Sequence, residues 1–95
     1  MKAGYVYMLT NKPHGALYLG VTDDLAKRVA QHRSRAVPGF TKRYNCHRLV
    51  WFVRFENIHD ARQAEVRMKK WNRIWKIARI AEMNPNWDDL AEMIA

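Results

Sequence analysis

Five polar residues in this chain of 95 residues have side chains with complementary chemistry: Tyr7, Tyr18, Arg28, His32 and Glu65. A guanidinium stays protonated and binds an anion as negative charge builds on it. A carboxylate is a ligand for a hard cation such as Mg²⁺. An unperturbed histidine, with a pKa of about 6.5, can accept a proton from a tyrosine, whose free pKa of about 10 makes it a poor base at neutral pH. These residue types suit hydrolysis of a phosphodiester bond, which needs an aligned water and stabilisation of developing negative charge.

Each of these residues also has an ordinary structural interpretation. Tyrosines in strands usually pack with the hydroxyl near the surface. Arginine and histidine on helices are usually solvated, and Glu65, surrounded by basic residues, would form an intrahelical salt bridge. The functional interpretation therefore depends on the five residues occurring together.

A β-hairpin is predicted to hold the two tyrosines. Residues 5–10 and 16–22 are β-branched and aromatic runs, and Asn-Lys-Pro-His-Gly separates them. If Thr10 pairs with Gly15, Tyr7 lies directly opposite Tyr18, with both side chains on one face.

The helix after the hairpin is predicted to position Arg28 and His32. We expect Thr22 or Asp23 to cap it, acidic residues to occupy its first turn, and the helix to run to about residue 34. Leu25 and Val29 form its buried stripe. Because Arg28 and His32 are four residues apart, they project from the same face of the helix.

The remaining pattern predicts an α+β domain. Residues 35–47 are predicted to be a loop because of their Pro-Gly pair, and residues 49–55 a third strand. Helices are expected from just after Asn57 or His59 to about residue 72 and over 74–83, with a short one over 87–94. The predicted order is β-β-α-β-α-α, a small three-stranded antiparallel sheet flanked by helices. We interpret residues 1–95 as a single domain, with a core at about 4–83 and an acidic C-terminal tail at 84–95.

The charge is unevenly distributed. The chain has 17 Lys and Arg against 9 Asp and Glu, a formal net charge of +8. Residues 62–79 carry seven Lys or Arg and one acid, whereas residues 80–95 carry four acids and no Lys or Arg. The basic part is suited to phosphate groups, and the acidic part repels them. The single cysteine, Cys46, cannot form an internal disulfide, and no run is long enough to span a bilayer. We expect a soluble cytoplasmic protein.

The joint pattern resembles the signature of the GIY-YIG nuclease family. Its first triplet is Tyr5-Val6-Tyr7 and its second is Tyr18-Leu19-Gly20, and Arg28, His32 and the helix-borne Glu65 follow. Ten residues separate the two tyrosines, and Arg28 comes ten residues after Tyr18, as in the family. The strings Leu9-Thr10-Asn11-Lys12, Phe40-Thr41-Lys42 and Lys69-Lys70-Trp71 are similar to the small, stand-alone, single-domain bacterial members. The resemblance covers about residues 4–90.

Three positions depart from the family pattern. Tyr5 stands where the family name expects glycine, and Val6 and Leu19 replace isoleucines. The aliphatic exchanges are conservative. The downstream polar partner of the family, often asparagine, has only a weak candidate here in Asn72.

The resemblance implies a DNA endonuclease that depends on Mg²⁺, with Mn²⁺ as a substitute. Glu65 would hold the metal, which neutralises the leaving 3′-oxygen, and Arg28 would bind the scissile phosphate. Tyr7 would orient or deprotonate the water, with Tyr18 beside it. His32 would either accept the proton from Tyr7 or orient Tyr7, and the sequence leaves both roles open.

DNA contacts are predicted where cations and aromatic residues alternate. Such mixtures suit single-stranded or branched DNA, whose bases stack on exposed rings. The candidate DNA-binding residues are Arg35, Phe40, Lys42, Arg43, Tyr44, Lys69, Lys70, Arg73 and Lys76. Trp71 and Trp75 are expected in the core, on an apolar stripe with Ala64, Met68 and Ala78.

Two other function classes fit the sequence. One is a nucleic-acid-binding module on the same fold without catalysis, which would need the basic surface but not Glu65 or Arg28. The other is a protein-interaction adaptor whose acidic residues 80–95 dock on a basic partner. Metal-dependent cleavage separates the nuclease from the first, and salt-sensitive DNA binding counts against the second.

Overall fold

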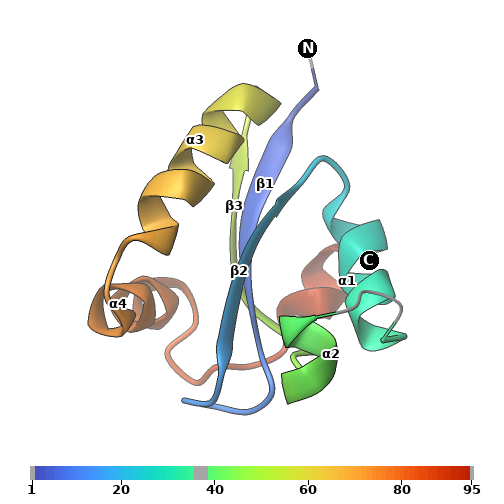
Figure 1. Cartoon of the computed structure of the whole chain (residues 1–95), viewed down its shortest axis with the longest axis vertical. Helices are drawn as coiled ribbons and strands as arrows, with labels where there is room; N and C mark the ends of the chain where they lie inside the picture. The colour runs from blue at the N-terminus through green and yellow to red at the C-terminus, as the bar shows by residue number, and fades with distance from the viewer. Residues whose placement is uncertain (1, 36–38, 95) are drawn as a thin grey trace.

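The computed structural model describes residues 2–35 and 39–94. One antiparallel sheet, in strand order β2-β1-β3, has helices on both faces (Figure 1). This architecture and the order of its main elements confirm the predicted fold class. The elements are β1 (Gly4–Thr10), β2 (Leu17–Thr22), α1 (Leu25–Arg33), α2 (Phe40–Tyr44), β3 (Arg48–Phe55), α3 (Ile58–Lys69), α4 (Arg73–Met83) and the 3₁₀ helix η1 (Leu90–Ile94).

The hairpin register differs from the predicted one by two residues. Tyr7 pairs with Gly20, and Leu9 pairs with Tyr18, so the two tyrosines are diagonal rather than direct neighbours. The connecting loop is longer than expected because the side chain of Asn11 accepts a hydrogen bond from the backbone of Ala16 at 2.9 Å, which closes it without strand pairing. A shift of two residues keeps every side chain on its face, so both tyrosines still lie on the same side of the sheet.

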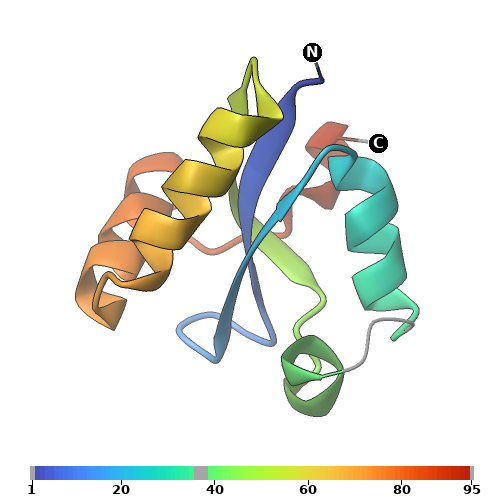
Figure 2. The same cartoon turned by 45° about the horizontal axis from the view of Figure 1, so that its top comes forward.

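The sheet separates two hydrophobic clusters. Val6, Met8 and Leu19 point to the face covered by α3 and α4, and the alternate residues Tyr7 and Leu9 point to the other face. That second face is covered by α1, α2 and η1, and the turned view shows the two sets of helices on either side of the strands (Figure 2). The alternation of strand side chains thus decides which residues can meet α1 and which can meet α3.

Helix α1 begins one residue later than predicted. Asp24 is its N-cap, and the Asp24 carboxylate accepts a hydrogen bond from the backbone N–H of Lys27 at 3.1 Å. The first turn contains no acid, contrary to expectation. Leu25 and Val29 are buried as predicted, and His32 is buried with them. The buried stripe of α1 therefore holds a polar residue that needs hydrogen-bond partners.

Helix α2 lies within residues 35–47, which were predicted to be a loop. Its single turn, Phe40–Tyr44, ends at Asn45 in the left-handed conformation (φ 57°), and Thr41 is buried on its inner side. The predicted loop was wrong here because a helix of five residues gives too little periodicity to be recognised beside a Pro-Gly pair.

Helices α3 and α4 match their predicted ranges closely, but the expected tryptophan stripe is wrong. Ala64 and Met68 are buried, and Trp71 packs against the core. Trp75 is 57% exposed, and Ala78 is exposed as well. The core face of α4 is formed by Ile77 and Ile80 instead, because Asn72 caps α4 and starts a new helix axis, so the periodicity of α3 does not continue.

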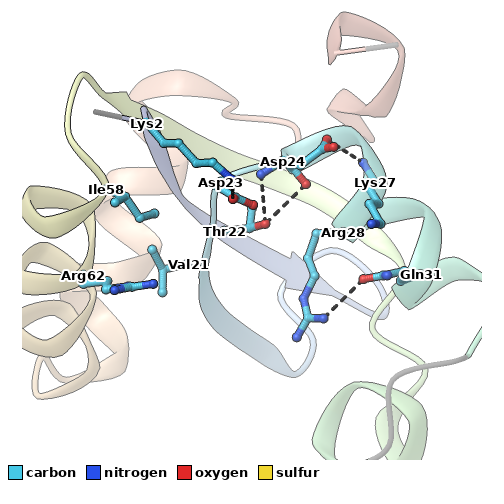
Figure 3. A pocket seen from close by; sticks show the side chains of 10 residues that line it. All are labelled: Lys2, Val21, Thr22, Asp23, Asp24, Lys27, Arg28, Gln31, Ile58 and Arg62. Atoms are coloured by element: carbon cyan, nitrogen blue, oxygen red, sulfur yellow. Dashed lines mark hydrogen bonds and ion pairs between the residues drawn. The ribbon is translucent and has the colours of Figure 1, made fainter.

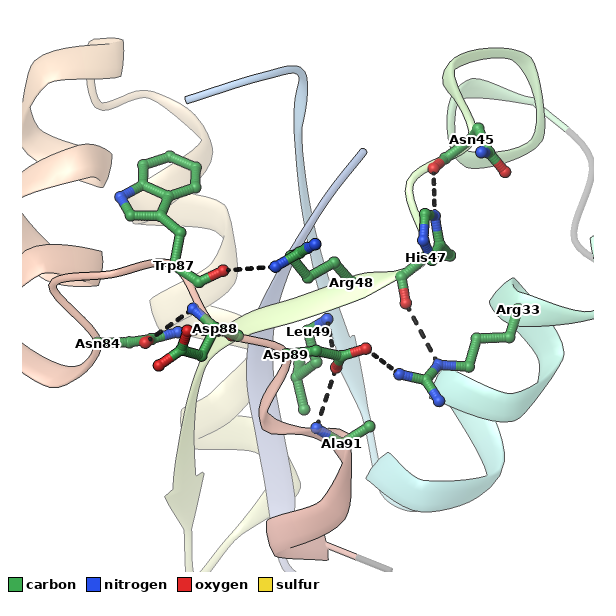
Figure 4. A network of polar contacts seen from close by, with 10 residues as sticks. All are labelled: Arg33, Asn45, His47, Arg48, Leu49, Asn84, Trp87, Asp88, Asp89 and Ala91. Atoms are coloured by element: carbon green, nitrogen blue, oxygen red, sulfur yellow. Dashed lines mark hydrogen bonds and ion pairs between the residues drawn. The ribbon is translucent and has the colours of Figure 1, made fainter. Parts of the chain in front are cut away.

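Residues 84–94 pack on the sheet, and their side chains form a polar network with it (Figure 4). Trp87 is buried in the core, and its carbonyl accepts a hydrogen bond from Arg48 at 3.1 Å. Asp89 accepts one from the backbone of Leu49 at 3.3 Å and forms an ion pair with Arg33. The core thus extends past residue 83, and one of the three acids in the tail is ion-paired within the chain.

No helix in the part of the chain that the structure describes is long and apolar enough to cross a membrane.

Candidate active site

Tyr7 lies at the centre of the site because β1 is the middle strand. Its side chain is fully buried and crosses beneath β2 at Gly20. A Cβ atom on Gly20 would lie 2.6 Å from the Tyr7 hydroxyl oxygen and 2.9 Å from Cε2 of Tyr18. Gly20 therefore leaves the space in which the two tyrosine rings meet, with their centroids 6.2 Å apart.

A buried chain of hydrogen bonds links Tyr7 to α1 and α2. The Tyr7 hydroxyl lies 3.1 Å from Nε2 of His32, and Nδ1 of His32 lies 3.0 Å from Oγ1 of Thr41. All three residues are buried. Both ring nitrogens of His32 are thus occupied, and the ring has one fixed orientation between β1 and α2.

The protonation states in this chain follow from burial and from Arg28. Burial raises the pKa of Tyr7 to about 12, although the neighbouring guanidinium of Arg28 lowers it in part. Burial, and then the charge of Arg28, lower the pKa of His32 to about 4. At neutral pH the histidine is therefore neutral and the tyrosine is protonated. With the guanidinium of Arg28 at the Tyr7 oxygen, we assign the Tyr7 hydroxyl as the donor to Nε2 of His32 and Nδ1–H as the donor to Thr41.

Arg28 also lines a pocket at the open edge of the sheet (Figure 3). The pocket has a volume of about 570 Å³ and lies between α1 and the first turns of α3, beyond the end of β2. Arg62 of α3 lines its other wall, next to Val21 (Figure 3). Both walls of the pocket therefore carry a guanidinium, which suits an anionic ligand.

Glu65 lies on α3, across the sheet from the tyrosines. Its side chain is 13% exposed and forms an ion pair with Lys69 at 2.9 Å. Among the described residues it makes no polar contact with Tyr7, Tyr18, Arg28 or His32. Glu65 is three residues after Arg62, so both side chains project from the same side of α3. The structure thus brings four of the five predicted catalytic residues together and places the fifth on the helix that forms the opposite pocket wall.

The aromatic residues predicted to contact DNA extend outward from the tyrosine pair. Phe40 is stacked on Tyr18, with ring centroids 6.4 Å apart, and Tyr44 lies 4.6 Å from Phe40. Phe40 and Tyr44 are 43% and 42% exposed, and the guanidinium of Arg43 lies over the Tyr44 ring at 5.4 Å. A row of rings therefore leads from the buried site to the surface of α2.

The predicted basic contacts have unequal surroundings. Lys42 is exposed on α2, and Arg35, also exposed, precedes the undescribed residues 36–38. Lys70 is exposed at the end of α3, whereas Lys76 is half-buried. Arg73 donates hydrogen bonds to the carbonyls of His14 and Gly15, at 3.0 Å and 2.6 Å, and so anchors the hairpin loop.

Comparison with known proteins identifies the family. The model of the GIY-YIG catalytic domain matches residues 3–78, which include all five catalytic candidates. The chain belongs to the GIY-YIG family. Its domain type implies a nuclease and a nucleic-acid ligand.

Curated relatives of similar length support the assignment to the small-protein subgroup of GIY-YIG. A UPF0213 protein from Clostridium perfringens is 35% identical over 81% of this chain and 82% of its own. One from Bacillus pumilus is 35% identical over 83% of this chain and 80% of its own. One from Cupriavidus pinatubonensis is 32% identical, with 83% and 87% covered. No solved structure matches the chain.

Two positions that were compared with the GIY-YIG pattern, Tyr5 and Asn72, have well-defined surroundings. Tyr5 is half-buried on the face of Tyr7, and its glycine neighbour Gly4 faces α3, where a Cβ atom would lie 2.8 Å from Ala61 Cβ. Close packing of α3 thus depends on Gly4. Asn72 accepts a hydrogen bond from the backbone of Trp75 at 3.0 Å as the cap of α4 and is exposed, so its evident role is structural.

Glu65 has the donor chemistry that a magnesium ion needs. No three His, Cys, Asp or Glu side chains gather around a common point in the described residues. Mg²⁺ is usually held by one or two carboxylates, with waters and substrate phosphates completing its octahedron. A single carboxylate on the helix that also carries Arg62 of the pocket wall meets that requirement, and the ammonium of Lys69 occupies a position at this carboxylate where a cation would bind.

Two important residues were missed by sequence reasoning. In the sequence, Thr41 is only part of a string that resembles the family, because nothing in its spacing shows that it meets His32. Arg62 is there only one charge on a basic helix. Since α1, α2 and α3 are not neighbours in the chain, only the packing of helices around the sheet could reveal these positions.

Proposed function

We propose that this protein is a metal-dependent DNA endonuclease that hydrolyses phosphodiester bonds. The observation that supports this most is the buried contact of Tyr7 with a neutral His32, beside the guanidinium of Arg28. A binding module would need the basic surface, but it would not need a buried proton acceptor behind a tyrosine. The hydrogen bond to His32 fixes the direction of the Tyr7 hydroxyl, which a catalytic tyrosine needs.

Arg28 would bind the scissile phosphate. It lines the pocket from α1, and its charge strengthens the binding of phosphate oxygens as negative charge builds on them. Arg62 faces the same pocket from α3 and can bind a flanking phosphate. Two cations on opposite walls would hold the strand across the edge of β2.

Tyr7 would orient and deprotonate the attacking water, which requires the wall over its buried hydroxyl to open when the substrate binds. With a pKa of about 12 its hydroxyl does not ionise by itself at neutral pH. As the Tyr7 oxygen takes a proton from water, the proton of Tyr7 moves to Nε2 of His32. This transfer requires the bound phosphate, whose negative charge offsets that of Arg28, to raise the pKa of His32 from its resting value of about 4. The water oxygen bonds to phosphorus, and the bond from phosphorus to the 3′-oxygen breaks. Thr41 keeps the acceptor nitrogen of His32 directed at Tyr7.

Glu65 would hold Mg²⁺, or Mn²⁺ in its place, through a carboxylate oxygen. Such an ion, when bound, neutralises the charge on the leaving 3′-oxygen. Lys69 must release the Glu65 carboxylate for this to occur, and it then becomes free to contact a phosphate of the same strand. Tyr18 packs beside Tyr7 and completes the wall of the site.

We propose single-stranded or branched DNA as the preferred substrate. The support is the row formed by Tyr18, Phe40 and Tyr44, whose exposed outer rings offer flat surfaces for unpaired bases. Arg43 lies over the outermost ring and adds a positive charge for the backbone. A duplex hides the faces of its bases, so it gains nothing from this row.

Cleavage of matched oligonucleotides in single-stranded, duplex and flap form tests the substrate proposal. With Mg²⁺ present we expect cutting of the single strand and of the flap, and much slower cutting of the duplex. Phe40→Ala should remove this preference. Equal cutting of all three forms would contradict the strand preference, and binding without cutting in Mg²⁺ or Mn²⁺ would establish a silent binding module instead.

A further inference from the structure

The start of α4 and the turn before it expose an aromatic corner that has no part in the site described above. Trp71 and Trp75 meet nearly at a right angle, with an interplanar angle of 74° and centroids 6.1 Å apart. Together with Ala78, Arg79 and Glu82 they line a hollow of about 340 Å³. The indole of Trp75 is 57% exposed, which is unusual for so large an apolar side chain.

A cation is fixed within this corner. The guanidinium of Arg79 lies over the ring of Trp71 at 5.4 Å and forms an ion pair with Glu82 at 3.2 Å. The stack holds Arg79 and also covers one face of Trp71. Trp75 keeps a free face next to a positive charge, an arrangement that accepts a flat ring joined to an anionic backbone.

The surrounding charge favours nucleic acid as the occupant. Residues 69–83 contain five Lys or Arg and one acid, Glu82, which is already paired with Arg79. An aliphatic surface of a protein partner would gain little from so many cations. Phosphate groups would gain from the accessible ones, Lys70 above all, because every contact releases a counterion.

The corner lies where a strand leaving the active site can reach it. Figures 1 and 2 show α4 beside α3, on the face of the sheet opposite α1 and α2. Arg62, in the first turns of α3, lines the catalytic pocket, and Lys70 follows the last turn, next to Trp71. These two positions are roughly 12 Å apart along the helix axis at 1.5 Å per residue. A strand that follows α3 would pass from the pocket to the tryptophans.

We propose that the Trp71–Trp75 corner is a second nucleic-acid contact, which stacks an unpaired base of the DNA strand on the free face of Trp75. This inference rests on the proposed function, because it assigns the corner to the same substrate. It also explains why Trp75 is exposed although Ile77 and Ile80 supply the core contacts of α4.

The test measures binding of a labelled oligothymidine in EDTA, so that it does not depend on cleavage. The strand should have about 20 nucleotides, which exceeds the site size of small single-strand-binding domains. Loss of one base–aromatic stack predicts a Kd about 5- to 150-fold weaker for Trp75→Ala and a smaller change for Trp75→Phe. Ile74→Ala is the matched control, because Ile74 is 74% exposed on the same helix but does not line the corner.

Tryptophan fluorescence supplies an independent readout. Stacking of a base on Trp75 should quench the emission of the wild-type protein, and Trp75→Phe should lose most of that quenching. Equal Kd values for Trp75→Ala and wild type would overturn the proposal, as would equal losses in Trp75→Ala and Ile74→Ala. A dimer in sedimentation that Trp75→Ala dissociates would overturn it too, since a second copy would then fill the corner. If the wild type binds DNA but never cuts it, the nuclease proposal fails. The binding test then still shows whether DNA contacts the Trp71–Trp75 corner.

Discussion

The hydroxyl of Tyr7 lies 3.1 Å from Nε2 of His32, and both side chains are buried between the sheet and α1. Their pKa values are shifted apart, with Tyr7 raised to about 12 and His32 lowered to about 4. In the resting protein the shared proton therefore belongs to the tyrosine. The Tyr7 oxygen becomes basic only as this proton moves to the histidine, so the two residues act as one unit.

Replacement of Thr41 tests how His32 is held. Thr41→Val keeps the shape but removes the acceptor of Nδ1–H, so the ring can turn or change tautomer. We expect kcat to fall on the order of 10- to 100-fold with little change in KM, because the lost function is proton transfer. An unpaired buried N–H also costs about 1–3 kcal/mol of stability.

Thr41→Ser is the control for that experiment, because it retains the hydroxyl and should recover most of kcat. Nitrogen NMR of the His32 ring provides a readout that simple loss of stability would not change. We expect the proton on Nδ1 in the wild type and a mixture of tautomers in Thr41→Val. A Thr41→Val protein with full kcat would show that Thr41 does not position His32.

The lowered pKa of His32 predicts a pH dependence of stability. Below about pH 6.5 the unfolded chain binds a proton at this histidine, while the folded chain stays neutral until about pH 4. The unfolded state thus binds more protons in that window, and stability falls as the pH is lowered through it, by at most about 3 kcal/mol.

Urea unfolding of wild type and His32→Gln across that pH range isolates the effect. The glutamine variant should lack the part of the pH dependence of the free energy of unfolding that comes from His32. The difference in free energy of unfolding between the two proteins should therefore vary with pH. In an NMR titration the ring of His32 should not titrate above about pH 5. Titration near the unperturbed value would contradict the proposed neutral acceptor.

Gly20→Ala tests the space under β2. Its Cβ would lie 2.6 Å from the Tyr7 oxygen, so the ring must shift away from His32. We expect destabilisation of about 1–3 kcal/mol, as for other overpacked sites, together with a large loss of kcat at temperatures where the variant is folded. Gly39→Ala is the control, since no atom lies within 4 Å of its added Cβ, although its φ of 98° adds backbone strain. Full activity in folded Gly20→Ala would contradict the proposed geometry.

The row formed by Tyr18, Phe40 and Tyr44 predicts that loss of a ring and loss of a neighbouring charge weaken DNA binding in different ways. Tyr44→Ala should weaken binding of a single strand by about 1–3 kcal/mol and change duplex binding little. Arg43→Ala should weaken both forms and reduce the slope of log K against log salt by about 0.7 for a single strand. Salt titrations of the two variants measure this. A Tyr44→Ala loss that is equal for duplex and single strand would argue against base stacking.

The sequence predicted correctly that the two tyrosines lie on the same face of the sheet, but it did not predict which residues pair with them. Strand alternation is set by the period of side chains and survived a register error of two residues. The register itself depended on Asn11, whose side chain closes the loop in place of a backbone pair. Where a side chain closes the loop of a hairpin, the composition of the loop does not reveal how many residues it contains.

Site residues that are related by the helical repeat were predicted from the sequence. Those that come together only through packing of separate helices were missed. Arg28 and His32 were placed together because they share one face of α1. Thr41 and Arg62 come from other helices, and no periodic pattern relates them to Tyr7. Trp75 was expected in the core, yet the cap at Asn72 turns α4 so that Ile77 takes that position. Contacts between elements that are distant in sequence are therefore what the structure adds.

Cleavage of a single-stranded oligonucleotide by wild type, Glu65→Gln and Tyr7→Phe, each with Mg²⁺ and with EDTA, tests the central claim most directly. Glu65→Gln keeps the size of the side chain but weakens its hold on a cation, and Tyr7→Phe removes only the hydroxyl. The proposal predicts cutting by the wild type in Mg²⁺, none in EDTA, and losses on the order of 100-fold or more in both variants, while DNA binding persists. Cutting that is undiminished in either variant, or that persists in EDTA, would contradict it.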